Sequence, residues 1–588
     1  MSMNHPSRRD FSGDARLLRI AALAAVIGAF STVAARVLLT LIRFFTDLFF
    51  YQRLSIEDLS PAHHTLGPWV IAVPVIGGLV IGLIARFGTE QIRGHGIPEA
   101  IEAILFKRSA MSPKVAVLKP LASGIAIGSG GPFGAEGPII MTGGAIGSLI
   151  AQHFKLTGAE RKSLLVAGAV SGMTAVFGTP VAAVLMAVEL LLFELRPRSL
   201  LPVATACAVA GFLRPLVVDG GVLFPLQTAP VAPIALLSCL AAGMLCGALA
   251  WFMSTTLYKV EDWFHRLPIH WMWWPALGGL AVGIGGYFQP RALGVGYDVI
   301  GDLLHNQLAL GVIAGLLAVK LVIWLVALGS GTSGGVLAPL LMLGAGLGAM
   351  LAPWLPGADP ALWPLVFMAA TLGGMMRAPV MAVVFAFELT HDANALLPLL
   401  AAAAGAYGFT VLAMGRSILT EKIARRCHHI YREYGTDPLE RHSVAEVMTA
   451  QPRSIDGGSM VAGVLAAHFG ADQAHRAYPV LRDGQLLGML DRAALAGQPG
   501  DALVGTLFGA NPPLVALPHE TCRAVATRLA VHGLERLPVV GDAASPRLLG
   551  IVSRSDLIKA TAGLHAEEHE RSALRRLPLT RAANPQRR

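Results

Sequence analysis

The stretch "GSGGPFGAEGPIIMTGGAIG", Gly128 to Gly147, places a single charged residue, Glu136, between two glycine–proline clusters. A near copy, "GSGTSGGVLAPLLMLGAGLG", begins at Gly329 and aligns with it without a gap, at an offset of 201 residues. A second pair, "TPVAAVLMAVEL" around Pro180 and "APVMAVVFAFEL" around Pro379, keeps an offset of 199. Two matched pairs at nearly the same offset indicate that this region consists of two related halves.

The composition indicates a membrane protein. Of 588 residues, 54% are hydrophobic and 14% are charged, and the mean hydropathy is +0.60, which is more apolar than a soluble domain. Apolar segments such as "LGPWVIAVPVIGGLVIGLIARF" and "LALGVIAGLLAVKLVIWLVALG" recur from about Leu17 to Leu412 and are long enough to cross a bilayer. Glycine and proline interrupt many others, and the freed backbone groups must then be buried in protein or line a watery cavity. We therefore expect an all-α polytopic domain of broken, tilted helices that acts as a transporter or channel.

The residue types near these breaks favour an anion. Glycines allow the backbone to approach a ligand, and a helix that begins after such a loop presents N–H groups and a positive dipole end. Only Glu136, Glu189 and Glu388 are carboxylates inside long apolar runs, and the sequence has no acidic cluster for a divalent metal. Matching broken helices in duplicated halves predict that the substrate site lies at the interface between the halves.

Two interpretations of Glu136 are open from the residues alone. It is either a first-turn carboxylate that complements a helix dipole, or a carboxylate in the anion pathway. In the second case it occupies the anion's site when ionised and leaves when protonated. A central membrane carboxylate costs about 2.5–3.5 kcal/mol on insertion scales, so such residues usually have a function.

Three ordered motifs resemble those of the CLC family of chloride channels and chloride/proton antiporters. The family's filter segments GSGIP, GREGP and GxFxP are matched here by "GHGIP" from Gly94, "GAEGP" from Gly134 and "GVLAP" from Gly335, and the resemblance spans roughly residues 15 to 425. It implies a homodimer of inverted-repeat subunits, each with its own pore for chloride or other small anions, with protons acting at Glu136 as the gating glutamate. The selectivity-filter residues that it implies are Gly94, His95, Gly96, Ile97, Pro98, Gly134, Ala135, Gly137, Pro138, Gly335, Val336, Leu337, Ala338, Pro339 and Leu419.

The sequence departs from the family pattern at four filter positions. His95 stands in place of a pore serine, so either its imidazole N–H donates to the anion or backbone amides act alone. The same histidine could make anion binding pH-sensitive, or it could be a neutral loop residue bonded to nearby carbonyls. Ala135, Leu337 and Leu419 replace an arginine, a phenylalanine and a tyrosine. Chloride remains the expected anion, with a different side-chain contribution to selectivity.

The proton route implied by the resemblance is also altered. Antiporters of the family often carry a second glutamate directly after the position of Glu189, and here that residue is Leu190. Glu189 and Glu388 occupy equivalent positions in the two halves, so a structural role in capping or bridging helices competes with proton transfer. Glu194 is a further candidate for the proton path, or a solvated helix end. Leu190, which cannot relay a proton, and Leu419, which removes a hydroxyl from the inner anion path, favour a passive, proton-gated channel. Glu189, Glu194 or water reaching Glu136 could instead serve a coupled antiporter.

The C-terminal part has the composition of a soluble α/β domain. "AYPVLRDGQLLGMLDRAAL" (477–495) and "RLPVVGDAASPRLLGIVSRSDL" (536–557) share the order Pro-Val, turn, Leu-Leu-Gly, short strand and helix start. Helical stretches precede them, and "SVAEVMT" is expected to open the first unit. The pattern resembles a tandem CBS pair, a regulatory module that often binds adenine nucleotides (ATP, ADP or AMP). Ser553 and Asp556 match its nucleotide motif, although a helix N-cap explains the two residues as well.

The expected organisation follows from these segments. Basic residues at both ends of the apolar region predict cytoplasmic termini in the inner (plasma) membrane, and the net charge of +9 suits anionic lipid surfaces, with no indication of nucleic acid. A CBS-bearing magnesium transporter would need intramembrane carboxylate clusters, and an enzyme would need a nucleophile–base pair or a metal motif; we find none of these. The expected boundaries are 1–16 for an N-terminal segment, 17–425 for the membrane domain with halves at 60–215 and 230–415, 426–442 for a linker, 443–497 and 504–563 for the two CBS units, and 564–588 for a basic tail.

Overall fold

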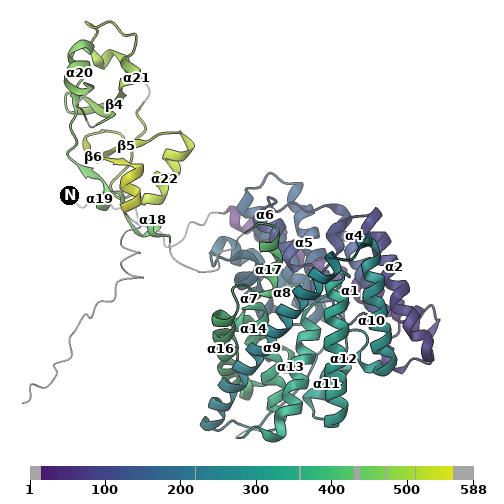
Figure 1. Ribbon diagram of the computed structural model, residues 1–588. Helices are drawn as coiled ribbons and strands as arrows, with labels where there is room; N and C mark the ends of the chain where they lie inside the picture. The colour runs from purple at the N-terminus through teal and green to yellow at the C-terminus, as the bar shows by residue number, and fades with distance from the viewer. Residues whose placement is uncertain are drawn as a thin grey trace, which may run out of the picture. The chain divides into compact units, whose positions relative to one another are not determined.

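The computed structural model describes residues 15–559, except 219, 357–358, 429–436, 471–472, 474 and 510–511. The chain divides into two compact units, Met1–Arg432 and Glu433–Arg588 (Figure 1). Most of the expected N-terminal segment, the centre of the expected linker, the last residues of the second CBS unit and the whole basic tail lie outside the described residues.

The first unit is helical throughout its described residues, as the sequence predicts. Seven of its described helices are long and apolar enough to cross a membrane, and others are short or broken. The α-helices are α1 (Arg16–Tyr51), α2 (Ala72–Phe87), α3 (Ile97–Leu105), α4 (Pro113–Gly128), α5 (Glu136–Gln152), α6 (Gly158–Phe177), α7 (Pro180–Met186), α8 (Pro197–Val217), α9 (Pro233–His265), α10 (Trp274–Phe288), α11 (Tyr297–Leu304), α12 (Leu310–Gly329), α13 (Leu337–Leu351), α14 (Leu362–Met376), α15 (Pro379–Thr390), α16 (Leu396–Ala413) and α17 (Ile418–Arg425).

Contacts between equivalent residues relate the two halves by a two-fold axis. A methyl group on Gly78 would lie 2.3 Å from the carbonyl oxygen of Pro275, and one on Gly279 would lie 2.2 Å from that of Pro74. Each residue of the first contact is 201 positions from its counterpart in the second, so α2 and α10 cross symmetrically. Only glycine permits backbones to approach this closely, which is typical of helix packing in membranes.

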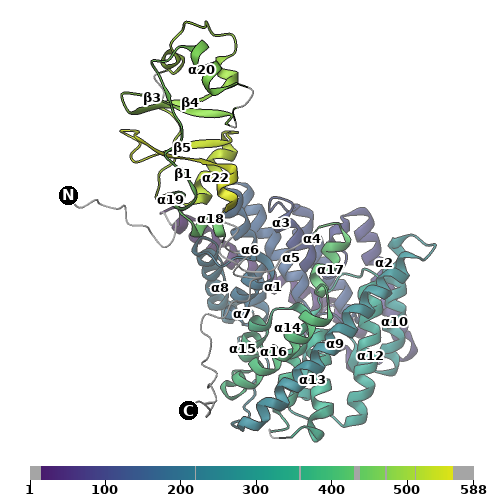
Figure 2. The ribbon, with the colours of Figure 1, turned by 60° about the vertical axis from the view of Figure 1, so that its left-hand side comes forward.

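The centre of this unit is formed by α6 and α14, which pack against α5 and α13 respectively (Figure 2). Every residue of α14 is buried, and so is α6 from Ser163 to its end. The long helices α1 and α9 instead expose large apolar side chains such as Phe30 and Leu245. A buried, mostly apolar centre and an exterior that exposes apolar side chains suit a bilayer as solvent.

The second unit contains two three-stranded sheets. One has the order β1 (Thr449–Ala450), β6 (Leu548–Ser553), β5 (Arg536–Val540), and the other has the order β2 (Ile455–Asp456), β3 (Ala477–Arg482), β4 (Gln485–Asp491). β2 and β3 are parallel, and the other pairs are antiparallel. The remaining helices of this unit are α18 (Pro438–Arg441), α19 (Val444–Val447), α20 (Val461–His468), α21 (Arg492–Leu495) and α22 (Cys522–Val531).

The two sheets exchange segments, which differs from the expected boundaries. "SVAEVMT" does not join the first sheet: Val444 and Val447 are buried with Val525 and Leu529 in the core of the second, and Thr449 pairs with Ile551. Residues 504–508, expected to begin the second unit, pack instead in the core around β3, with Val504 fully buried there. Which strands pair across the two repeats is decided by tertiary contacts, so the local sequence pattern does not predict it.

Candidate functional site

The three predicted filter loops meet at the two-fold axis. Gly134 and Gly335, equivalent residues of the two halves, form an antiparallel bridge in which the N–H of Gly335 donates to the carbonyl of Gly134 over 2.9 Å. A methyl group on Gly137 would lie 1.9 Å from the carbonyl oxygen of His95 and 3.4 Å from Gly335 Cα. GHGIP, GAEGP and GVLAP, which lie far apart in the sequence, therefore make one compact cluster.

Each of these loops leads directly into a helix. Ile97 and Pro98 begin α3, Glu136 begins α5 with Gly137 and Pro138 behind it, and Leu337 begins α13. Gly94 and Gly96 have φ angles of +73° and +87°, so a side chain at either position would be strained. Ala135, Val336, Ala338 and Pro339, the remaining predicted members, lie at the starts of α5 and α13. Three helix N-termini thus contribute N–H groups to the cluster.

The carboxylate of Glu136 lies in the middle of this cluster. Glu136 is fully buried, and methyl groups placed on Gly134 and Gly335 would lie 2.0 and 2.3 Å from its Oε2 atom. Neither carboxylate oxygen makes a hydrogen bond of ordinary geometry with any described residue, and the donors closest to doing so are the backbone N–H groups of Glu136 itself and Ala338. The side chain therefore occupies a position where α5 and α13 both begin.

His95 is buried beside this position. Its exposure is 2%, and neither ring nitrogen has a hydrogen-bond partner within the described part of the chain. The interpretation of His95 as a loop histidine bonded to nearby carbonyls is therefore wrong. The charged groups near the ring come from three elements: Glu99 from α3, Lys119 from α4, and Lys422 and Arg426 from α17 and its C-cap. A buried N–H without a partner is suited to an anion.

Two buried lysines, which we did not predict, hold the carbonyls of the glycine loops. Lys119 Nζ donates to the carbonyls of Ile92 and Gly94 over 2.8 and 2.9 Å. Lys320, its equivalent 201 residues later, donates to Ala292 and Gly294 over 3.0 and 2.8 Å. Both are fully buried. Because these carbonyls face ammonium groups, they are turned away from a bound anion. The signal was present in the sequence, as one lysine at the same place in two matched apolar runs.

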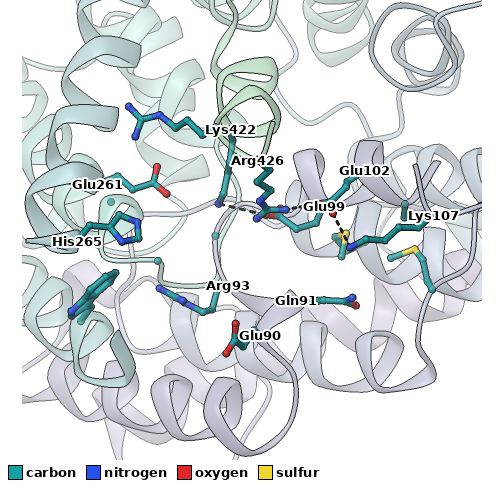
Figure 3. Close-up of a pocket in the computed structure, with 18 of the residues that line it drawn as sticks. Glu90, Gln91, Arg93, Glu99, Glu102, Lys107, Glu261, His265, Lys422 and Arg426 are labelled. Carbon is teal, nitrogen blue, oxygen red and sulfur yellow. Dashed lines mark hydrogen bonds and ion pairs between the residues drawn. The ribbon is translucent and has the colours of Figure 1, made fainter. Parts of the chain in front are cut away.

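A cavity of about 450 Å³, which we call the α17 vestibule, is lined by charged side chains that include Glu99 and Lys422 (Figure 3). It reaches Gly94 of the first filter loop. Lys422 on α17 extends to this glycine: a methyl group on Gly94 would lie 2.4 Å from Lys422 Nζ. The ammonium is 3.5 Å from Glu99 Oε1, and Arg426 Nη2 is 2.9 Å from the same oxygen. Glu102 also forms an ion pair with Arg426, and a second one with Lys107, whose Nζ lies 2.8 Å from Glu102 Oε1. The vestibule therefore joins α17 to the filter helix α3 by ion pairs.

A second cavity of about 530 Å³, the α11 vestibule, reaches the filter at Ala135, Gly296 and Tyr297. Gly294 and Gly296 repeat the positive φ angles of Gly94 and Gly96, at +64° and +79°. The two vestibules therefore approach the cluster through equivalent loops of the two halves. Together they form a candidate path that is closed in its middle by Glu136.

The apolar replacements lie in the interior. Leu337 and Leu190 are 0% and 1% exposed, and Leu419, near the start of α17, is also buried. Tyr258 of α9 donates its hydroxyl to the carbonyl of Ile418, directly before Leu419. A tyrosine hydroxyl is thus present near this segment, from another helix, and it is bound to the backbone.

The two candidate proton-path glutamates, Glu189 and Glu194, and Glu388, the equivalent of Glu189 in the second half, form hydrogen bonds outside the filter loops. Glu189 Oε2 accepts from the N–H of Met381 over 3.0 Å, and the two oxygens of Glu388 accept from the N–H groups of Val181 and Ala182 over 3.0 and 2.8 Å. Glu194 accepts from the Ser199 hydroxyl over 2.6 Å. It also lies within 4.0 Å of basic side chains, those of Lys162, Arg196 and Arg198.

The profile of the voltage gated chloride channel family matches residues 77–411, more than half of the chain. The chain belongs to the CLC family. It is therefore an anion transport protein and not an enzyme, and the magnesium-transporter alternative no longer applies. The CBS domain profile matches residues 506–563.

Bacterial CLC proteins are among the chain's relatives. It is 27% identical over 421 residues to the "putative chloride channel protein ClcB-like" of Ralstonia nicotianae, covering 70% of this chain and 97% of that protein. It is 32% identical over 371 residues to the "voltage-gated ClC-type chloride channel ClcB" of Citrobacter koseri, covering 60% and 87%.

Solved CLC structures share the fold. A slow cyanobacterial Cl⁻/H⁺ antiporter superposes with a TM-score of 0.62 at 22% identity, over 71% of this chain and 99% of that one. A eukaryotic CLC transporter gives 0.58 at 19% identity, over 92% and 98%. The predicted CLC membrane fold followed by a C-terminal CBS region is confirmed.

In the second unit, the predicted nucleotide residues bind each other. Ser553 Oγ donates to Asp556 Oδ2 over 2.6 Å, the N–H of Asp556 approaches Ser553 Oγ at 3.3 Å, and Lys559 Nζ lies 2.6 Å from Asp556 Oδ1. This is a reciprocal cap on the helix that follows β6. Burial alone would raise the pKa of Asp556, but the hydrogen bonds from Lys559 and Ser553 hold it below its ordinary value.

Proposed function

We propose that the chain conducts chloride passively through one pore per subunit of a homodimer, with Glu136 as the gate. The observation that carries this proposal is the buried carboxylate of Glu136, enclosed by Gly134 and Gly335 where α5 and α13 begin. Helix N-termini favour negative charge, so an ionised carboxylate and a chloride ion compete for the same place. Protonation removes the charge of the carboxylate, and chloride can then occupy the site.

His95 is proposed as a ligand of the permeating anion. Its ring is buried, and its nitrogens have no partner in the described residues. The neutral imidazole has one N–H that can donate to an anion, and Lys119, Lys422 and Arg426 are the cations near it. The same cations attract chloride into the α17 vestibule, which we propose faces the cytoplasm because α17 precedes the C-terminal unit.

The coupled chloride/proton antiporter is the second candidate, and two observations disfavour it. Leu190 is buried and cannot carry a proton, and the carboxylate of Glu189 accepts a hydrogen bond from the backbone of α15. Reversal potentials in liposomes with separate chloride and pH gradients decide between the two. A channel reverses at the chloride equilibrium potential at every pH difference, whereas a reversal that shifts with the proton gradient would establish antiport.

The CBS pair is proposed to bind an adenine nucleotide through a site that includes Ser553 and Asp556, and thereby to regulate the pore. The ligand must displace the hydrogen bonds between these two residues. Calorimetry on the full-length protein tests this: Asp556→Ala should weaken binding of ATP, ADP or AMP by tenfold or more. Asp491, which caps α21 at the position equivalent to Ser553, is the control, and Asp491→Ala should bind normally. No heat with any of the three nucleotides at millimolar concentration would refute the proposal.

We place the protein in the inner membrane with both termini in the cytoplasm, as the basic segments at both ends of the apolar region suggest. Cysteine labelling of single-cysteine variants from each side of sealed vesicles tests this topology. Cross-linking in membranes tests the homodimer.

A further inference from the structure

The hydroxyl of Tyr297 is a buried polar group for which the proposed function has not yet given a role. Tyr297 is the first residue of α11 and lines the α11 vestibule. Its oxygen is inaccessible to solvent and has no hydrogen-bond partner anywhere in the residues that the structure describes. Burying a hydroxyl without a partner is costly, so the position calls for a function.

The ring of Tyr297 has a fixed setting. It lies edge-on to Phe177 and Phe224, with both pairs of ring centroids 6.2 Å apart. The preceding residue, Gly296, has a positive φ, and the carbonyl of Gly294 is held by Lys320. The hydroxyl is therefore a preorganised donor rather than a mobile one.

Ala135, the neighbour of Glu136, lines the same vestibule as Tyr297. A carboxylate that rotates out of the filter into this vestibule therefore arrives in a cavity whose wall includes Tyr297.

The other polar side chains of the vestibule already have partners. Arg43 pairs with Asp58 at 2.8 Å, the Ser60 hydroxyl donates to Asp298 over 3.1 Å, and Arg214 donates to the carbonyl of Gly221 over 3.0 Å. An ionised carboxylate arriving in the vestibule can bind the hydroxyl of Tyr297 without breaking any of these contacts. The hydroxyl gives up no protein partner in doing so.

We propose that Tyr297 is a positioning residue of the gate, whose hydroxyl donates a hydrogen bond to the ionised carboxylate of Glu136 after it has left the filter. This deepens, and rests on, the proposed gating role of Glu136. It gives the pore an open state that does not require protonation: Glu136 stays charged, and chloride occupies the filter. Flux at neutral and alkaline pH then depends on Tyr297, whereas flux at acid pH, where Glu136 is neutral, does not.

The test is Tyr297→Phe, which removes the hydroxyl and keeps the ring between Phe177 and Phe224. We expect chloride flux from liposomes with equal pH on both sides to fall at least about fivefold at pH 7.5, as for the loss of a hydrogen bond to a charged group. At pH 4.5 the flux should change less than twofold. Tyr287→Phe is the matched control, since Tyr287 on α10 is 47% exposed, and it should behave as wild type at both values.

The same substitution is then made in Glu136→Gln, which has no charge to hold. Tyr297→Phe should have no further effect there. Equal losses at both pH values, a loss that persists in Glu136→Gln, or no loss at pH 7.5 would each overturn the role of Tyr297. A wild-type pH response in Glu136→Gln alone would overturn the gating proposal, and with it this inference, so the two failures are distinguishable.

Discussion

Glu189 and Glu388 each cap the helix that leads to the other. Glu388, on α15, accepts from the first-turn N–H groups of α7, and Glu189, on the π-helical turn (Ala187–Leu192) that continues α7, accepts from the first turn of α15. The reciprocity follows from the two-fold axis, since the residues are equivalent in the two halves. A carboxylate that satisfies a helix N-terminus is held by N–H groups that have no partner within their own helix.

Loss of either cap should therefore lower stability and leave transport by the folded protein unchanged. We expect Glu388→Ala and Glu189→Ala each to cost about 1 kcal/mol or somewhat more, as for other N-caps. Thermal unfolding in detergent measures the first effect, and chloride flux per folded protein measures the second. If Glu189→Ala changed the pH response of flux at normal stability, Glu189 would belong to the proton path after all.

Replacing Glu136 by Gln should make flux nearly independent of pH. Glutamine has the size of the protonated side chain, and it cannot become the anion that competes with chloride. Flux at pH 7.5 should rise towards the acid value of the wild type. The control is Glu194→Gln at the surface of the same half, where the carboxylate already has several basic neighbours, and its pH profile should match that of the wild type.

Removal of the His95 ring should weaken chloride binding. A hydrogen bond to a charged group contributes about 1.5–3 kcal/mol, so His95→Ala should raise the chloride dissociation constant by tenfold or more. His95→Ser restores a donor and should recover part of the loss. Isothermal calorimetry in a non-binding anion checks both variants. Equal affinities for wild type and His95→Ala would leave the backbone amides as the ligands.

The Glu520–Arg528 pair predicts how the second unit responds to pH. Burial alone would raise the pKa of Glu520, but hydrogen bonds from Arg528 at 2.6 Å and from the N–H of Leu517 at 2.8 Å hold it below its ordinary value. A lowered pKa means that Glu520 stabilises the fold above pH of about 4.3 and loses this contribution as the pH falls through the lower, folded value.

Arg528→Met should therefore lower the free energy of unfolding of the C-terminal unit at pH 7 by about 1 kcal/mol, and lower its melting temperature accordingly. The difference in stability between Arg528→Met and the wild type should decrease as the pH falls from 5 to 3. Calorimetry on the full-length protein measures it. Arg523→Met, which breaks a more exposed pair with Asp437, is the control and should have a smaller effect at pH 7. A gap that widened in acid would contradict the assignment.

The features that could be predicted from the sequence are those that occur in both halves of the membrane unit. The broken helices, the glycine loops around Glu136 and the two halves are local patterns that occur twice, so a single chain displays them. Lys119 and Lys320 were equally visible, because each stands alone in an apolar run at matching positions. The role of Glu189 stayed open, because the backbone that it caps is about 190 residues away.

Two other features depend on tertiary structure that no local pattern contains. Tyr297 is an ordinary tyrosine in the sequence, and only the structure shows that its hydroxyl is buried without a partner in the described residues. The segment exchange in the second unit depends on which strand pairs with β6. Strand β1 has too few residues for its sequence to specify this pairing.

That exchange has a consequence for synthesis on the ribosome. Val444 and Val447, the first core residues after the membrane unit, have their partners in α22, β5 and β6 at the other end of the unit. Their side chains stay exposed until nearly the whole chain has been synthesised, because the residues that they pack against are not made earlier. A nascent chain that stops after β4 also lacks Val504, which completes the first core. The second unit is therefore synthesised in sequence order, but its two cores are completed only when its last strands have been made. A premature stop anywhere within it should leave apolar surface accessible to proteases.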